Sequence, residues 1–225
     1  LGVESDDDMK LPALILASTS PRRAELLREL EVEFTIVRSD APGLTLTSIE
    51  PLDATRRLAH LELARVAAEP LGEAFGAGPA LARTLDQARV ALACESAGGA
   101  QRCLDSAVAW AKQRVQFARP IGSFQAIQHK CAEVLLEVES AKSAAHFACW
   151  AAQQDENLPL AAATAKSFCD EAYLRASQES LHIHGGVGFT WEAEPHLYFK
   201  RAKASETLLG PPAFQRARIA QALGF

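Results

Sequence analysis

The chain has 225 residues, 48% of them hydrophobic, which is enough for one large or two small domains with a buried core. Its 28 acidic residues outnumber its 23 lysines and arginines, so the formal net charge is −5. This balance argues against a surface for nucleic acid or for an anionic membrane, and an anionic ligand would need local positive sites.

The cysteines lie within helix-like stretches and lack Cys-x-x-Cys spacing. We therefore interpret all five as buried free thiols: Cys94, Cys103, Cys131, Cys149 and Cys169. No apolar run reaches the roughly 18 residues that a membrane-spanning helix needs, and no signal-peptide pattern opens the chain. These features predict a cytoplasmic protein. The first residue is Leu1 rather than methionine, as expected for a fragment.

The first predicted elements are a strand at residues 14–17 and a helix over residues 22–30. Ser20 is well suited to cap this helix, and Pro21 is favoured at its first position. A strand, a turn and a helix in this order can present backbone N–H groups and the two arginines after Pro21 to a phosphate. The segment is therefore a candidate anion site.

The stretch from Leu14 to Leu27 resembles the opening of the Maf-type nucleotide pyrophosphatases. In that family, a Ser-x-x-Arg-Arg turn helps to hold a nucleoside triphosphate. The resemblance covers about residues 11–40, and the Asp-Thr strand that carries the family's catalytic carboxylate does not follow. A fused N-terminus and a chance similarity both remain open, and we assign no pyrophosphatase activity to this turn.

Short β-like runs come next. Residues 34–37 and 44–46 are apolar and are separated by the turn-forming sequence of residues 39–43. Residues 53–59 indicate a loop, and residues 61–63 a further strand. This part of the chain is predicted to form a small β-containing segment.

Long apolar-periodic segments follow a glycine-rich linker at residues 72–78. They predict helices over about residues 79–116, 124–154, 159–183 and 194–209, with a short last helix after Pro211 and Pro212. Short loops join the four main helices. The predicted fold is therefore mainly α, an antiparallel four-helix bundle preceded by the small β-containing segment.

The spacing also predicts which faces of the first two helices are buried. One predicted face carries Leu81, Leu85, Ala88, Leu92 and the stretch from Cys94 to Ala97. The second carries Val134, Leu135, Val138, Ala145 and Ala148. Many residues on these faces are small, which permits close contact between helices.

Residues 114–125 read Arg-Val-Gln-Phe-Ala-Arg-Pro-Ile-Gly-Ser-Phe-Gln and join two predicted helices through a Pro/Gly turn. With the later run from His184 to Thr190, His-Gly-Gly-Val-Gly-Phe-Thr, this pattern resembles the C-terminal helical domain of flavin-dependent acyl-CoA dehydrogenases. The resemblance implies three parts. Residues 1–32 are an atypical N-terminal segment, residues 33–72 a remnant of the family's middle β-domain, and residues 73–225 its C-terminal bundle.

The residues alone leave two interpretations of these motifs. Arg114 suits the negative end of a helix dipole or the oxygens of a pyrophosphate, and paired glycines suit a helix C-cap or the close approach of a ligand. The resemblance implies contacts with FAD that is held mainly by a neighbouring subunit. The implied cofactor-binding residues are Arg114, Phe117, Gln125, His182, Gly185 and Gly186, although the position of His182 is usually Gln in the family.

No metal site is expected, because His182 and His184 lack a third ligand at a suitable spacing. The resemblance also implies a catalytic Glu, but its two usual positions fall on Leu209 and Ala88, so the catalytic residue is unknown. Glu206, about one helical turn before Leu209, is the nearest candidate for a shifted base. Asp86 and Glu95 are also nearby carboxylates, and a solvated helix-face charge is an alternative role for each of the three.

The function implied by this resemblance is α,β-desaturation of acyl-CoA by a flavin-dependent subunit or fragment of one. Residues 191–202 match a bacterial subgroup in which some subunits are partners of a catalytic sister chain. We therefore expect either a homo-oligomer or a hetero-oligomer with a sister acyl-CoA dehydrogenase subunit. The alternatives are a non-enzymatic helical assembly module and, less favoured, a Maf-like pyrophosphatase.

Overall fold

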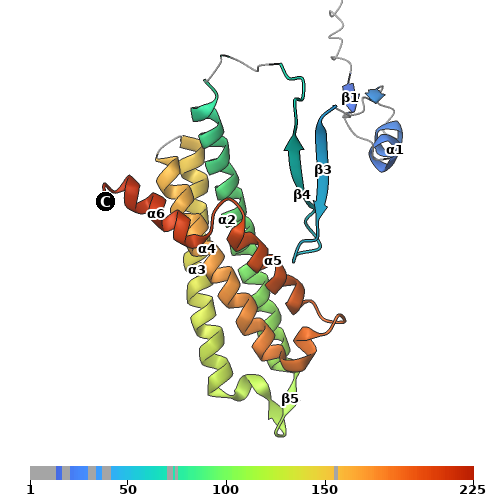
Figure 1. Cartoon of the computed structure of the whole chain (residues 1–225). Coiled ribbons are helices and arrows are strands. Elements are labelled where there is room, and N and C mark those ends of the chain that lie inside the picture. Colours follow the sequence, from blue (N-terminus) through green and yellow to red (C-terminus); the bar gives the residue numbers. More distant parts are fainter. Residues whose placement is uncertain are drawn as a thin grey trace, which may run out of the picture. The chain divides into compact units, whose positions relative to one another are not determined.

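The computed structural model describes residues 14–16, 21–29, 34–36, 42–69, 73, 76–154 and 157–225 (Figure 1). Contacts divide these residues into two units. The N-terminal unit comprises the described parts of residues 1–48 and 59–69, and the bundle unit comprises those of residues 49–58 and 70–225.

The N-terminal unit contains two small sheets. Strand β1 (Leu14–Leu16) pairs in parallel with β2 (Phe34–Ile36), and helix α1 (Pro21–Glu29) lies between them in sequence. Strands β3 (Leu44–Ile49) and β4 (Leu58–Leu63) pair with each other and are longer than predicted. The predicted cap Ser20 lies outside the described residues.

The bundle unit contains five α-helices within the described part of the chain (Figure 1), and two short 3-10 helices, Ile121–Ser123 and Gly185–Phe189. The α-helices are α2 (Gly78–Gln113), α3 (Gln125–Gln154), α4 (Leu158–His184), α5 (Pro195–Thr207) and α6 (Pro212–Ala222). Helix α4 contacts each of the other four. The prediction of a mainly helical fold with about four long packed helices is confirmed.

Proline starts four of these helices. It occupies the first or second position of α2, α4, α5 and α6. Its fixed φ angle suits the first turn, where its missing N–H has no helical partner to lose.

Two predicted helix ends were wrong. Helix α2 stops at Gln113 rather than Gln116, because β5 (Val115–Gln116) pairs antiparallel with β6 (Arg119–Pro120) to form a hairpin. Helix α5 stops at Thr207, and Leu209 adopts a positive φ of 56°. The helical hydrogen-bond pattern therefore ends before Leu209.

Alanines dominate the bundle core. Ala93 and Ala97 of α2 pack in one cluster with Ala141 and other small residues of α3 and α4, and Ala100 packs in a second cluster with Val138 and Tyr173. Small side chains allow the helix axes to approach closely. The helices therefore pack largely through contacts between their backbones rather than through interlocking large apolar side chains.

The predicted buried faces were only partly correct. Leu81 is 59% exposed and Leu135 46% exposed, whereas the charged residues Asp86 and Arg89 are buried. Leu81, Leu85 and Leu92 of α2 therefore lie beside the buried face, whereas Val90 and Leu104 join the alanines in the core.

Gly99 is required by a close contact within the core. A Cβ atom at this position would lie 2.4 Å from Cζ of Tyr173, whereas a Cβ at Gly98 would meet no atom within 4 Å. We expect Gly99→Ala to lower the free energy of unfolding by about 1–3 kcal/mol through overpacking. Gly98→Ala should raise it by up to about 1 kcal/mol through helix propensity. Urea unfolding of both variants checks this, and equal effects would contradict it.

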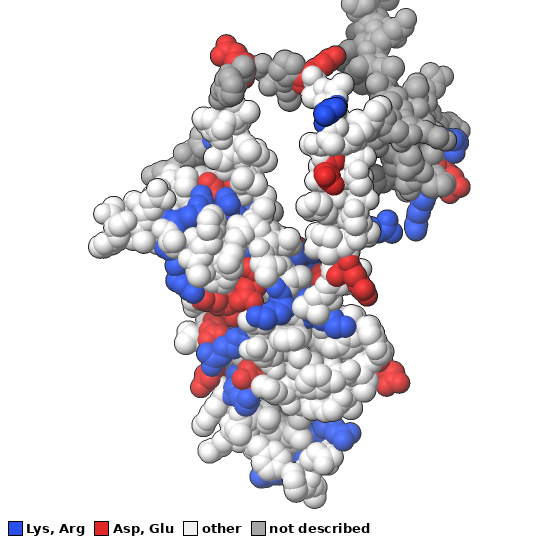
Figure 2. All heavy atoms as spheres, viewed as in Figure 1, with Lys and Arg blue, Asp and Glu red and all other residues white. Residues whose placement is uncertain are grey.

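Charged side chains of both signs interleave over the face formed by α5, α6 and the adjoining parts of α3 and α4 (Figure 2). Ion pairs connect these helices: Arg216 pairs with Glu171, and Arg175 pairs with Glu133 and Glu137. Among the described helices, none is long and apolar enough to span a membrane.

Candidate functional site

The end of the bundle that carries the β5–β6 hairpin also carries the end of α4 (Figure 1). Here the rings of Trp110 and His184 stack with centroids 5.1 Å apart. Nδ1 of His184 lies 2.7 Å from the carbonyl oxygen of Ser180, and Nε2 lies 3.4 Å from the Ser106 hydroxyl. These contacts hold the C-terminal turn of α2 next to the glycine loop that follows α4.

The predicted helix placed Arg114 in its last turn. In the structure, α2 ends at Gln113 and Arg114 is the C-cap residue. Its backbone is extended, and its N–H donates to the carbonyl of Trp110 at 2.8 Å. The exposed guanidinium carbon lies 5.9 Å from the Trp110 ring centroid, in the range of a cation–π contact. A positive charge is thus presented to solvent beside two stacked aromatic rings.

Phe117 lies at the tip of the hairpin. Its φ is 52° and it is 88% exposed, with its ring edge-to-face with Phe124 at 6.1 Å. Gln125 is the exposed first residue of α3. Backbone hydrogen bonds from Ile121 to Arg114 and from Phe124 to Ile121 fold the hairpin back, so both ends of this segment lie at one end of the bundle.

His182, Gly185 and Gly186 are all exposed in the same region. His182 Nδ1 lies 3.5 Å from Glu179, which also accepts a hydrogen bond from Lys130. Partial burial raises the pKa of Glu179, but Lys130 and His182 outweigh it and the net pKa is lowered. His182 thus contacts the Lys130–Glu179 ion pair, three residues before Gly185.

The glycine loop leaves room for a ligand. Gly185 has a φ of 63°, and Cβ atoms added at Gly185 and Gly186 would meet no atom within 4 Å. Gly188 differs, because its Cβ would lie 3.0 Å from Cβ of His184. A cavity of about 390 Å³ adjoins Trp110, Gln113 and His184. An arginine, an aromatic surface and bare backbone fit a dinucleotide, whose pyrophosphate needs charge and whose rings need flat apolar contacts.

The neighbour of one position at which the resemblance implies a base is hydrogen-bonded to the other position. Arg89, next to Ala88 on α2, donates from Nε to the carbonyl oxygen of Leu209 at 3.1 Å. Gln215, fully buried, donates to the same oxygen at 2.9 Å. Neither the methyl group of Ala88 nor the isobutyl group of Leu209 can accept a proton.

The spacing had suggested that Glu206 lies one helical turn before Leu209. In the structure, no helix connects the two residues. Helix α5 ends at Thr207, and Glu206 accepts a hydrogen bond from Lys203 at 2.7 Å. Nor is Asp86 a free base, because it pairs with Arg89 and Arg218, each at 2.8 Å.

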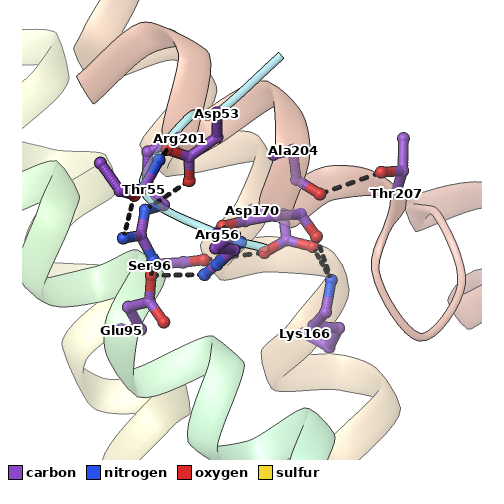
Figure 3. Close-up of polar contacts among 11 residues, drawn as sticks. Asp53, Thr55, Arg56, Glu95, Ser96, Lys166, Asp170, Arg201, Ala204 and Thr207 are labelled. Carbon is purple, nitrogen blue, oxygen red and sulfur yellow. Dashed lines mark hydrogen bonds and ion pairs between the residues drawn. The ribbon is translucent and has the colours of Figure 1, made fainter. Parts of the chain in front are cut away.

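A polar network that the sequence did not reveal joins the loop at residues 49–58 to α2 and α5 (Figure 3). Arg56 donates to Glu95 at 2.5 Å and to the Ser205 hydroxyl at 3.0 Å. Arg201 donates to Glu95 at 2.8 Å and to Thr55 at 2.6 Å. Glu95 is therefore shared by two arginines, one from the loop and one from α5.

Asp53 completes the loop end of this network. Oδ1 accepts hydrogen bonds from the backbone N–H and the hydroxyl of Thr55, at 3.0 and 2.6 Å. Oδ2 lies 2.7 Å from Nε of Arg201, an ion pair without hydrogen-bond alignment. The sequence Asp-Ala-Thr-Arg of residues 53–56 thus provides three side chains that fasten the loop to the bundle.

Lys166 and Asp170 form the buried end of the network. Both side chains are 0% exposed and pair with each other, while Ser96 donates to Asp170 at 2.8 Å and Lys166 donates to the carbonyl of Ser205 at 3.0 Å (Figure 3). Burial raises the pKa of Asp170, and Lys166 and Ser96 oppose this shift. The pair ties α2, α4 and α5 together inside the bundle.

A cavity of about 620 Å³ adjoins this network. Its wall includes Glu95, Gly98, Tyr173, Tyr198 and Arg201. No sequence motif indicated it. Among the described residues, no group of three or more His, Cys, Asp and Glu side chains is arranged to hold a metal ion.

Two family models match the sequence. The one described as acyl-CoA dehydrogenase, C-terminal domain, matches residues 76–224, and the one described as Maf-like protein matches residues 13–110. The first covers all of α2 to α6. The second includes β1, α1 and β2 and overlaps α2.

Curated relatives are similar over most of this chain. Acyl-CoA dehydrogenase IpdE2 of Mycolicibacterium smegmatis is 41% identical over 168 residues, which cover 75% of this chain and 50% of the relative. Probable acyl-CoA dehydrogenase YngJ of Bacillus subtilis is 37% identical over 195 residues, 84% of this chain and 51% of the relative. The chain spans about half the length of these relatives.

Solved structures give the same result. Butyryl-CoA dehydrogenase of Megasphaera elsdenii superposes with a TM-score of 0.77 at 28% identity, covering 83% of this chain and 50% of that one. The ChsE4-ChsE5 complex of Mycobacterium tuberculosis has a chain that superposes with a TM-score of 0.74 at 29% identity, covering 83% and 50%. By its helical bundle and by the matched family model, this chain belongs to the acyl-CoA dehydrogenase family.

Proposed function

We propose that this chain forms the C-terminal half of a subunit of a flavin-dependent acyl-CoA dehydrogenase. In this proposal, FAD held mainly by a neighbouring subunit contacts Arg114, Phe117, Gln125, His182, Gly185 and Gly186. The observation that carries the proposal is the Trp110–His184 stack, because it brings the exposed Arg114 next to the unobstructed glycine loop.

Each group would have a distinct task. Arg114 would donate charge-assisted hydrogen bonds to the pyrophosphate, Phe117 would pack against a ring, and Gln125 and His182 would add polar contacts. Gly185 and Gly186 would let backbone approach the phosphates without a Cβ clash. A bound flavin would supply hydride acceptance in the desaturation of the acyl thioester.

We further propose that this chain supplies no base for the reaction. The α-proton of an acyl thioester must pass to a carboxylate, and Ala88 and Leu209 occupy the two positions at which the resemblance implies one. The subunit would then act in a hetero-oligomer with a sister chain that contains the base. One of the similar structures, the ChsE4-ChsE5 complex of Mycobacterium tuberculosis, is a complex of two differently named proteins.

We expect Arg114→Ala to weaken FAD binding by roughly 10–100-fold, the loss of one or two charge-assisted hydrogen bonds. The measurement is FAD titration of the full-length oligomer, followed by flavin fluorescence, with size-exclusion chromatography of the same sample. Assembly should be unchanged, because the guanidinium of Arg114 is exposed at the helix end.

Arg175→Ala is the matched control. Arg175 is also a partly exposed arginine, but it pairs with Glu133 and Glu137 on the side of the bundle. Its replacement should leave FAD affinity unchanged. Equal FAD affinity in the Arg114 variant and the parent would refute the proposed cofactor site. A colourless parent oligomer, alone and with its sister chain, would instead favour the non-enzymatic assembly module.

A further inference from the structure

Two cysteines touch each other across the interface between α2 and α3. The Sγ atoms of Cys94 and Cys149 lie 3.3 Å apart, and both residues are partly buried. A disulfide bond has a length of about 2.05 Å, so the two sulfurs need to approach by only about 1.3 Å.

The surrounding residues explain why the two thiols meet. Cys94 and Cys149 pack against a cluster that includes Ala93, Ala97, Ala145 and Ala148. Because these neighbours are alanines, the two backbones run close enough for short cysteine side chains to bridge the gap.

The other three cysteines are placed differently. Cys169 is buried and donates from Sγ to the carbonyl of Ala141 at 3.3 Å, while Cys103 is buried in a separate core cluster. Cys131 packs at the edge of two further clusters. Among the described cysteines, the only thiol–thiol hydrogen-bond contact given by the structure is that between Cys94 and Cys149.

We propose that Cys94 and Cys149 form a reversible disulfide when the protein meets a peroxide. One thiolate attacks hydrogen peroxide, which breaks the O–O bond, releases hydroxide and leaves a sulfenic acid. The second thiol then attacks that sulfur, forms the S–S bond and releases water. Overall, two thiols are oxidised and one peroxide is reduced to two waters. A dithiol reductant reverses the change.

The bond would link the two helices on either side of the candidate cofactor turn. The chain segment that it closes runs from residue 94 to residue 149 and contains Arg114, Phe117 and Gln125. Closing this segment lowers the conformational entropy of the unfolded chain, which stabilises the folded form relative to it. Oxidised protein should therefore unfold at a higher temperature than reduced protein.

The pair should stay reduced without an oxidant. Burial and the contact with Cys149 raise the pKa of Cys94 to about 11, so this thiol is protonated at neutral pH. Thiolate is the reactive form. Cross-linking through Cys94 should therefore proceed faster at pH 9 than at pH 7.

Trypsin separates all the cysteines, which makes the test unambiguous. Cleavage after lysine and arginine places them in peptides 90–102, 103–112, 131–142, 143–166 and 167–175. The folded full-length protein is treated with hydrogen peroxide, its remaining thiols are alkylated, and it is digested without reduction. Mass spectrometry should find peptides 90–102 and 143–166 joined, with the mass of two hydrogens lost, and dithiothreitol should separate them.

Matched variants make the result specific. Cys149→Ser and Cys94→Ser should each abolish the linked peptide and the oxidation-dependent rise in the melting temperature. Cys131→Ser should change neither, and circular dichroism of each variant checks that it folds. Linkage of peptide 90–102 to 167–175 instead, or sulfinic acid at Cys94 without a linked peptide, would overturn the proposal. A flavin-free preparation serves equally well, so this outcome is independent of the proposed cofactor site.

Discussion

Asp170→Ala is expected to destabilise the bundle by about 3–5 kcal/mol, because it leaves the charge of Lys166 buried without its counter-ion. Both side chains are fully buried, and only the carbonyl of Ser205 would remain as an acceptor for the Lys166 ammonium group. The hydroxyl of Ser96 would also lose its acceptor. Urea unfolding followed by circular dichroism measures the change in the free energy of unfolding.

Two further variants separate the buried charge from the loss of a side chain. Lys166→Met combined with Asp170→Asn removes both charges and keeps an acceptor for Ser96, so it should destabilise much less than Asp170→Ala. Glu139→Ala breaks the more exposed Lys142–Glu139 pair and should cost about 0.5 kcal/mol or less. If Asp170→Ala lowers the free energy of unfolding by less than about 1 kcal/mol, the Lys166–Asp170 pair does not stabilise the bundle as proposed.

Leu209→Glu is expected to give the subunit a base of its own. If the proposed function is correct, a homo-oligomer of the full-length parent should not desaturate acyl-CoA. Introducing the carboxylate should raise turnover by about 10²-fold or more, the usual contribution of a positioned general base. The turn is already fixed by Arg89 and Gln215, which hold the carbonyl of residue 209, so the new side chain starts from a rigid backbone. Turnover is measured with an artificial electron acceptor.

Ala88→Glu and Glu206→Gln are the companion variants. Ala88 is the other position at which the resemblance implies a base, and the guanidinium of its neighbour Arg89 binds the carbonyl of Leu209. Ala88→Glu should also raise turnover. Glu206→Gln should have no effect, because Glu206 is paired with Lys203. An active parent homo-oligomer that is inactivated by Glu206→Gln would show that Glu206 is the base and that the subunit is complete.

The sequence was sufficient for the helices but not for their exact ends. Apolar periodicity correctly indicated a mainly helical fold with about four long packed helices. The hairpin after α2 was missed because the predicted helix was extended through Val115 and Gln116, whereas their backbone pairs with residues 119 and 120. The Pro/Gly turn was recognised, but the apolar pattern did not show that a strand begins directly after Arg114.

The buried face of α2 was also hard to predict. Leucines suggested one stripe, but the close approach of α3 and α4 selects alanines, and leaves Leu81 exposed within this chain. Lys166 and Asp170 were missed for a related reason, since an i, i+4 pair on a helix usually lies on the surface. A usable signal was present: alanines and a cysteine surround this pair on α4.

The candidate site residues were chosen from the two sequence motifs. That these residues bind the cofactor is still a prediction. The sequence did indicate that Arg114 and Gln125 lie at a turn between two helices. It could not place His184 against Trp110, because residues 74 positions apart meet only through the packing of α2 on α4. The contact between Cys94 and Cys149 was hidden in the same way by the unknown register of two helices.

The alanine-lined interior has a consequence for how such subunits diverge. At an alanine between two closely packed helices, almost every substitution enlarges the side chain and pushes the helices apart. Amino-acid replacement in the interior is therefore strongly opposed. Outward-facing positions carry no such constraint. A duplicated gene could therefore change its associations and lose a reactive group at the periphery, while the scaffold that holds its helices together stays the same.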